Sequence, residues 1–275
     1  MLLLTIVLAG SLAQPGRGEI GCRVESPEKT PPVTRTLQDG VVVTMTRRSG
    51  PDAVEDACQV EVKDRAGKVV FSKMGFNTEL HADSGRDVDN DGSPDLVIGV
   101  DDGGGNRCCW EYSVLSLRPA PHVVANFDNP AFESDASGKT IVWNLIPFYS
   151  LGPSLAESPT IVYAMQFRSG KLVEVTGEYC AAMLAGRLTG WADFSGDLAR
   201  LTPAAMAASR RTASGARVSD EVSQVRGAAT SLALQMMYCG REGEARTLIE
   251  RVWPDSEQEN MRSTVSIAVA ASRHK

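Results

Sequence analysis

The sequence lacks the basic clusters that nucleic-acid-binding proteins need. It has 275 residues, of which 34 are acidic and 28 are Lys or Arg, and its formal net charge is −6 at pH 7. Phosphate binding depends on lysine and arginine side chains gathered on one face, and no such stripe stands out along the chain. The composition therefore argues against a nucleic-acid partner.

Long hydrophobic runs are also missing beyond the N-terminus. No later stretch reaches the roughly 20 apolar residues that a membrane-spanning helix needs, so we expect no membrane span. Residues 2–12 are apolar, and small residues stand at Ser11 and Ala13, as at the cleavage site of a secretory signal peptide. We predict a signal peptide over residues 1–13 and a secreted or periplasmic protein. A buried or frayed apolar N-terminus is the alternative.

The motifs of common catalytic sites are absent. The three histidines are scattered and no Cys-x-x-Cys pair exists, which argues against zinc. The glycine run at 103–105 lacks the phosphate-binding patterns and favours a close-packed turn. No serine lies in a nucleophile elbow. His81 and Asp83 could serve acid–base chemistry, although a lone histidine on a turn is more often simply solvated.

Six cysteines are consistent with export, because an even count in an exported chain favours disulfides. Six cysteines allow fifteen pairings, among which we predict Cys22–Cys58 and Cys180–Cys239. The adjacent Cys108 and Cys109 would form a vicinal bridge or stay reduced.

The composition changes along the chain. Residues 14–39 are rich in Pro, Gly and charge and predict a linker or N-terminal arm. Over residues 40–176, short β-branched runs are separated by turn residues, which predicts hairpins. Residues 177–275 show apolar spacings of three and four, which predict helices. We predict an α+β protein: a mostly antiparallel β domain, as a sandwich or a partial propeller-like arrangement, followed by a small α-helical domain.

The expected elements follow from these patterns. Thr202 is a good N-cap before a proline, and Gly240 follows the end of a long helical run. The predicted helices are residues 179–187, 203–211, 219–239, 242–252 and 256–272. The predicted strands are residues 41–47, 57–63, 68–72, 96–100, 112–117, 122–127, 140–145, 160–167 and 171–175.

The strongest chemical signal is the run DVDNDGSPD at residues 87–95. Ca²⁺ takes six to eight oxygen ligands, and alternate residues of a tight loop can aim their side chains at one point. Gly92 would supply the sharp turn. Crowded carboxylates repel one another without a cation, so the pattern favours a calcium site over an ordinary solvated turn. Magnesium is the weaker candidate because it prefers a smaller octahedral shell and retains waters. The predicted carboxylate ligands are Asp87, Asp89, Asp91 and Asp95.

The pattern Asp-x-Asp-x-Asp-Gly-x-x-Asp-Leu resembles the calcium loop of FG-GAP repeats, the VCBS-type, integrin-α-like family. The resemblance implies a loop within a β-hairpin, with a hydrophobic strand from Leu96 and the backbone carbonyl of Ser93 as a further ligand. A helix–loop–helix calcium switch would instead need a glutamate at position 12, where Ile98 stands. Residues 128–139 resemble a degenerate second copy, with acidic residues but without the regular spacing. Residues 103–112 are similar to a segment of exported bacterial proteins that carry one such loop.

These features together predict an exported, calcium-binding, non-catalytic protein in which Ca²⁺ stabilises a β-hairpin loop. Its role would lie in binding or in the cell envelope, with an unknown protein or polysaccharide partner. The alternative is a calcium-dependent extracellular hydrolase, in which a base such as His81 shares a pocket with the metal. An inhibitor or periplasmic partner protein is a third possibility.

Overall fold

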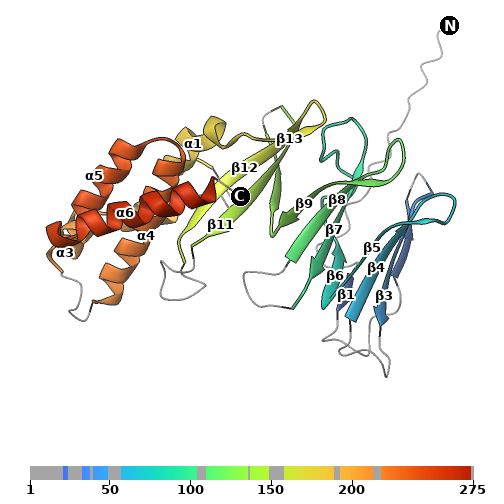
Figure 1. Ribbon diagram of the computed structural model, residues 1–275, viewed down its shortest axis with the longest axis horizontal. Helices are drawn as coiled ribbons and strands as arrows, with labels where there is room; N and C mark the ends of the chain where they lie inside the picture. Colours follow the sequence, from blue (N-terminus) through green and yellow to red (C-terminus); the bar gives the residue numbers. More distant parts are fainter. Residues whose placement is uncertain are drawn as a thin grey trace, which may run out of the picture. The chain divides into compact units, whose positions relative to one another are not determined.

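The computed structural model shows an α+β chain with three β-sheets followed by helices (Figure 1). The signal peptide predicted over residues 1–13 and the Cys108–Cys109 pair lie outside the residues that it describes. The described residues are 21–23, 33–37, 40–48, 57–103, 110–135, 137–148, 158–188, 193–212 and 218–273.

The strands pair in three antiparallel sheets, and no closed barrel forms among the described residues. One sheet has the order β1-β6-β7-β8-β9, with β1 (Gly21–Arg23), β6 (Asn77–Leu80), β7 (Asp95–Asp101), β8 (Trp110–Ser116) and β9 (His122–Asp128). A second has the order β2-β3-β4-β5, with β2 (Val33–Thr36), β3 (Val42–Arg48), β4 (Ala57–Lys63) and β5 (Val69–Gly75). The third has the order β10-β11-β12-β13, with β10 (Ala131–Ser134), β11 (Thr140–Pro147), β12 (Thr160–Arg168) and β13 (Lys171–Glu174).

Helices follow the third sheet. They are α1 (Thr176–Leu184), α2 (Ser195–Arg200), α3 (Pro203–Arg211), α4 (Asp220–Tyr238), α5 (Glu242–Val252) and α6 (Asp255–Ser272). The hydroxyl of Thr202 accepts a hydrogen bond from the backbone N–H of Ala205 at 3.2 Å, which caps α3 as predicted. Gly240 follows α4 with a positive φ of 74°, a conformation that glycine adopts without strain.

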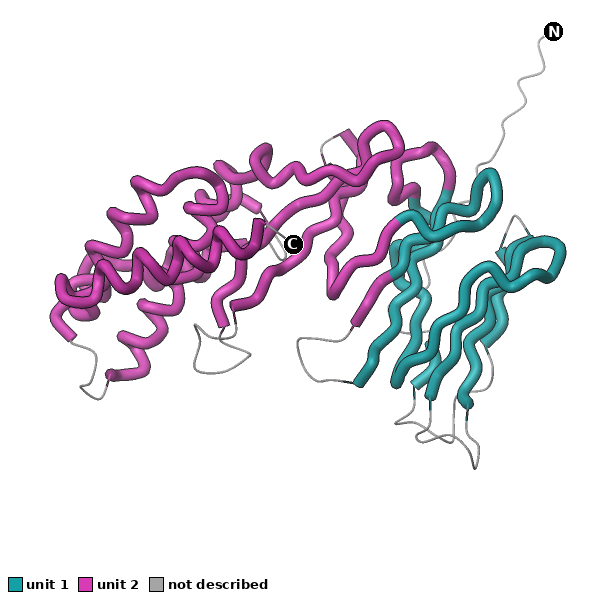
Figure 2. The backbone as a smooth tube through the Cα atoms, viewed as in Figure 1, with its two compact units in different colours: residues 1–86, 94–103, 113–124 teal, residues 87–93, 104–112, 125–275 magenta. Residues whose placement is uncertain are grey.

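The chain forms two compact units (Figure 2). The first comprises residues 1–86, 94–103 and 113–124, and the second comprises residues 87–93, 104–112 and 125–275. Each unit has its own hydrophobic core. One core is built mainly from β-strand side chains, and the other is built from the third sheet together with the helices.

In the first unit, two sheets share a core. Cys58, Val60 and Val62 of β4 are fully buried on one face, as their alternation predicts. Leu96 and Ile98 of β7 belong to the same core. The two sheets are therefore packed face to face, which is the sandwich arrangement among the predicted alternatives.

A disulfide joins the two sheets of this sandwich. Cys22 of β1 and Cys58 of β4 are bonded, with 5.6 Å between their Cα atoms. The pairing predicted for these two cysteines is confirmed. In the second unit, Cys180 of α1 is bonded to Cys239, directly after α4, with a Cα–Cα distance of 5.9 Å. The second predicted pairing is confirmed as well.

In the second unit, helix α4 covers an open edge of β12. Strand β13 pairs with β12 only from Met165 onward, so earlier residues of β12 need other partners on that side. The side-chain amide of Gln235 accepts from the Val162 N–H at 2.9 Å and donates to the Val162 carbonyl at 3.0 Å. The Thr176 hydroxyl accepts from the Ala164 N–H at 3.0 Å. The buried Gln235 thus takes the place of a neighbouring strand.

Candidate metal centre

Backbone hydrogen bonds close the base of the acidic loop. The Asp95 N–H donates to the Arg86 carbonyl at 2.8 Å, and the Gly85 N–H donates to the Asp95 carbonyl at 2.7 Å. Asp95 is also the first residue of β7. Residues 87–94 therefore project from an antiparallel pair of segments, and the last carboxylate of the motif is fixed by the sheet.

Within the loop, side-chain carboxylates fold the backbone. Asp87 accepts from the N–H groups of Asp91 and Gly92 at 3.0 and 2.9 Å, and Asp89 accepts from Asp91 at 3.0 Å. Asn90 and Gly92 have positive φ values of 60° and 89°, a region that asparagine tolerates and glycine adopts freely. The turn expected at Gly92 is present. An ionised carboxylate has lone pairs for several partners, so these bonds leave room for a cation.

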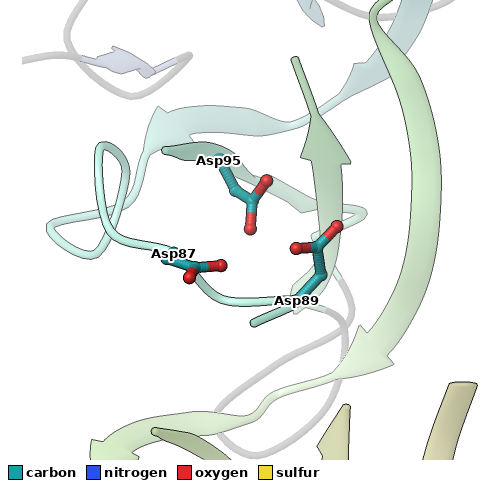
Figure 3. Close-up of side chains that lie close together, drawn as sticks. All are labelled: Asp87, Asp89 and Asp95. Carbon is teal, nitrogen blue, oxygen red and sulfur yellow. The ribbon is translucent and has the colours of Figure 1, made fainter. Parts of the chain in front are cut away.

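Three of the four predicted carboxylates converge (Figure 3). Asp87, Asp89 and Asp95 each offer one oxygen, and these oxygens all lie within 4.8 Å of one another. Asp95 is fully buried and Asp89 is 9% exposed. Asp91 is exposed, and its carboxylate accepts from the Ser93 N–H at 2.7 Å. The structure therefore brings together the first, third and ninth loop positions, and Asp91 lies outside this group.

The electrostatics of this cluster require compensation. At a separation of no more than 4.8 Å and an effective dielectric constant near 20, two carboxylates repel each other by at least about 3 kcal/mol. Removing Asp89 and Asp95 from water adds a further cost. A cation or protonation relieves both terms. The cluster has the hard oxygen ligands that Ca²⁺, Mg²⁺ and Mn²⁺ prefer, so it could hold a metal ion.

The loop is also attached to the third sheet. The Thr140 hydroxyl donates to the Asp87 carbonyl at 3.0 Å, and the Thr140 N–H donates to Asn90 Oδ1 at 3.2 Å. Asn90 Nδ2 donates to the Phe167 carbonyl at 3.2 Å. Sequence reasoning missed these contacts because the partners lie 50 to 77 residues apart in the chain. The asparagine between two aspartates carried no signal of a partner outside the loop.

His81, Asp83 and Arg86 form a cluster just before the loop. His81 Nδ1 lies 3.1 Å from a carboxylate oxygen of Asp83, and Arg86 forms an ion pair with the same carboxylate. Burial raises the pKa of Asp83, but the hydrogen bonds from His81 and Arg86 outweigh it and hold the pKa below its usual value. Asp83 is thus an ionised acceptor that orders the turn leading into the loop.

The glycine run after β7 forms a turn at its first residue. Gly103 has a positive φ of 85°, and an added Cβ would lie 3.3 Å from Cβ of Phe76. The Gly103 N–H donates to Asp101 Oδ1 at 2.9 Å. This agrees with the close-packed turn predicted for the run, whose later residues 104–105 lie outside the described part of the chain.

The degenerate acidic segment forms the hairpin between β10 and β11. One carboxylate oxygen of Asp135 accepts from the Ser137 hydroxyl and from the N–H groups of Ser137 and Lys139. The other accepts from Gln166 Nε2 at 3.0 Å. These bonds, led by the one from the Ser137 hydroxyl, lower the pKa of Asp135 to about 2. This carboxylate therefore stabilises the β10–β11 hairpin and its contact with Gln166 of β12.

Compared with protein-family models, with curated proteins and with solved structures, the chain shows no match. The resemblance to FG-GAP repeats therefore stays a prediction based on the loop motif. Within the described part of the chain, no helix has the length and apolar character needed to cross a membrane. The two disulfides are consistent with a secreted or periplasmic protein.

Proposed function

We propose that this is an exported protein that binds Ca²⁺ at residues 87–95 and uses the ion to stabilise its fold. The observation that carries the proposal is the convergence of Asp87, Asp89 and Asp95, two of them buried. Ligands on opposite sides of one Ca²⁺ ion, each at about 2.4 Å, are about 4.8 Å apart. The three oxygens, none farther than 4.8 Å from another, are therefore close enough together to share one calcium ion.

Further ligands would come from the same loop. Calcium needs six to eight oxygens, and three carboxylates supply only part of that number. In this proposal, the Ser93 carbonyl and water complete the shell together with the Asp91 carboxylate, which turns inward from its exposed position when the ion binds, as the resemblance to FG-GAP loops implies. Magnesium is the weaker candidate because it keeps several waters and demands a smaller octahedral shell.

The role we infer is non-catalytic, in binding a protein or polysaccharide or in the cell envelope. Support comes from the state of Asp83, which is engaged by Arg86 and by the nearby His81. The Asp83 carboxylate is therefore shared with the Arg86 guanidinium and is not reserved for orienting a histidine base. A calcium-dependent hydrolase would instead need an open metal position facing a base.

Calcium titration of the full chain tests the proposal. Isothermal titration calorimetry should show Ca²⁺ binding that exceeds Mg²⁺ binding in affinity. Calcium at 100 times its Kd should stabilise the folded state by about 2.7 kcal/mol relative to EGTA. Equal melting curves in calcium and in EGTA would contradict the proposal.

Two matched variants locate the site. Asp87→Asn removes one ligand charge and should abolish the calcium-dependent stabilisation. Asp64→Asn makes the same change in another turn, where Asp64 accepts from the N–H groups of Ala66 and Lys68, and should leave calcium binding unchanged. If both variants bind calcium like the wild type, the site lies elsewhere.

A further inference from the structure

The attachment of the acidic loop to the third sheet involves two loop positions at once. The Thr140 hydroxyl holds the carbonyl of Asp87, and the Thr140 N–H holds the side chain of Asn90. Asn90 in turn donates to Phe167. Thr140 begins β11 and is 2% exposed, whereas Phe167 lies near the end of β12. Two neighbouring strands therefore fix the backbone between the first and fourth positions of the loop.

This backbone determines where two carboxylates lie. Asp87 and Asp89 are separated by one residue. Both belong to loop residues 87–90, which are hydrogen-bonded to Thr140 at Asp87 and to Thr140 and Phe167 at Asn90. Asn90 has a positive φ of 60°, and both its side-chain Oδ1 and its Nδ2 are hydrogen-bonded, to Thr140 and to Phe167 respectively. A binding site whose ligands are already held in place loses less conformational entropy when the ion arrives. None of these three hydrogen bonds uses a carboxylate oxygen of the cluster.

We propose that Asn90 and Thr140 are positioning residues for the cation site, and that the ion and the adjoining ends of β11 and β12 stabilise each other. This inference rests on the proposed function, because it concerns the affinity of the same loop for Ca²⁺. Thermodynamic linkage makes the effect reciprocal. If the attached sheet raises calcium affinity, bound calcium must stabilise the attachment by the same factor.

The affinity side of this coupling is tested by removing the Thr140 hydroxyl. Thr140→Val deletes the bond to the Asp87 carbonyl, keeps the side-chain volume and leaves the backbone N–H for Asn90. We expect calorimetry on the full chain to show Ca²⁺ affinity weakened about tenfold, which corresponds to about 1.4 kcal/mol. Thr140→Ser restores a hydroxyl and should recover most of the affinity.

Thr230→Val is the matched control. Thr230 is 5% exposed, lies in α4 and donates to the Arg226 carbonyl at 2.7 Å. The substitution therefore removes a buried threonine hydroxyl without altering the loop attachment, and calcium affinity should stay at the wild-type value. Equal weakening in both threonine variants would overturn the inference, because a general loss of stability would then explain the result.

Asn90→Gly provides a second, independent variant. Glycine accepts the positive φ at this position and removes both side-chain bonds of Asn90, so the loop can keep its course while only the Thr140 hydroxyl still attaches it to the sheet. Calcium affinity should fall at least as far as in Thr140→Val. This variant also keeps the inference testable if Thr140→Val does not fold.

Hydrogen exchange provides the reciprocal readout. In the wild type, calcium should slow exchange at the N–H groups of the β11 start and the β12 end, as well as in the loop. In Asn90→Gly, saturating calcium should still protect the loop, but it should no longer protect the β12 end, whose link to the loop is the lost bond from Asn90 to Phe167. If the wild type binds no calcium, the proposed function itself fails. If the wild type binds calcium, and both Thr140→Val and Asn90→Gly bind it with the same affinity as the wild type, only the coupling fails.

Discussion

Asp89 and Asp95 are the residues that most clearly connect the folding of this protein to a cation. Both are at least nine-tenths buried, and both lie in a group of three carboxylates. Buried carboxylates that repel one another destabilise a metal-free fold, and the same crowding strengthens the binding of a divalent cation. Stability without metal and affinity for metal should therefore respond in opposite directions to the charge of this cluster.

Neutralising one of these carboxylates tests that relation. Asp89→Asn keeps the oxygen that accepts from the Asp91 N–H and removes one negative charge. In EGTA, we expect the variant to be more stable than the wild type by about 1–2 kcal/mol, because part of the repulsion is gone. In saturating calcium, it should be less stable than the wild type. Thermal melting in both buffers measures the two signs, and a variant that is less stable in both would contradict the electrostatic account.

Asp135 predicts a dependence of stability on pH in a different part of the chain. Its pKa is lowered from 3.8 to about 2 by the hairpin hydrogen bonds, so the folded state favours the ionised form. The resulting stability is present above pH 3.8 and is lost as the pH falls through about 2. Asp83, whose pKa is also lowered, acts in the same direction. Urea unfolding between pH 5 and pH 2, in EGTA, should show a shallower pH slope for Asp135→Asn than for the wild type.

At the scale of elements, sequence patterns correctly predicted the helices whose ends are set by capping residues and apolar spacing within the helix itself. The predicted bounds of α3 and α5 agree with the structure, because a capping threonine, a proline and clear apolar spacing define them. Sequence reasoning missed α2 and the strands β1, β2, β6 and β10, which have only three to six residues. Such short segments form through pairing with distant strands or through packing, and carry little periodicity of their own.

The candidate site shows the same division. The convergence of Asp87 and Asp89 follows from a nine-residue motif, whose side chains and glycine act over a single turn. The complete burial of Asp95 depends on β7 and its neighbours, and the role of Thr140 depends on strand β11, which begins 53 residues after Asp87. The spacing of a motif thus predicts ligands, whereas the groups that hold the loop come from the tertiary fold.

Gln235 provides a prediction at this scale, because one side chain replaces a strand at the edge of β12. Gln235→Leu places an apolar side chain of similar size in the core but leaves the N–H and C=O of Val162 without their bonds. We expect a loss of about 2–4 kcal/mol in the free energy of unfolding, since each buried unsatisfied backbone group costs about 1–3 kcal/mol. Gln224→Leu, at an exposed position of the same helix, should change stability by much less. Chemical denaturation of both variants measures the difference.

At the scale of the whole molecule, two separate cores each contain or adjoin one disulfide. The Cys22–Cys58 bond lies within the core of the first unit, and the Cys180–Cys239 bond lies in the core of the second. The change in composition near residue 177 marks where strands give way to helices. The cores divide the chain differently, because β11 and β12 bury their side chains against α1 and α4. Packing, rather than the type of element, defines the units.

Each disulfide should therefore stabilise mainly its own unit. Replacing Cys180 and Cys239 together by alanine should cost about 2–5 kcal/mol and speed hydrogen exchange in α1, α4 and β12. Exchange in β3 and β4 should remain close to that of the wild type. The paired replacement of Cys22 and Cys58 is the matched control, and it should give the reverse result. If either double variant loosens both cores equally, the two units unfold as one cooperative structure, and the division into separately stabilised cores is wrong.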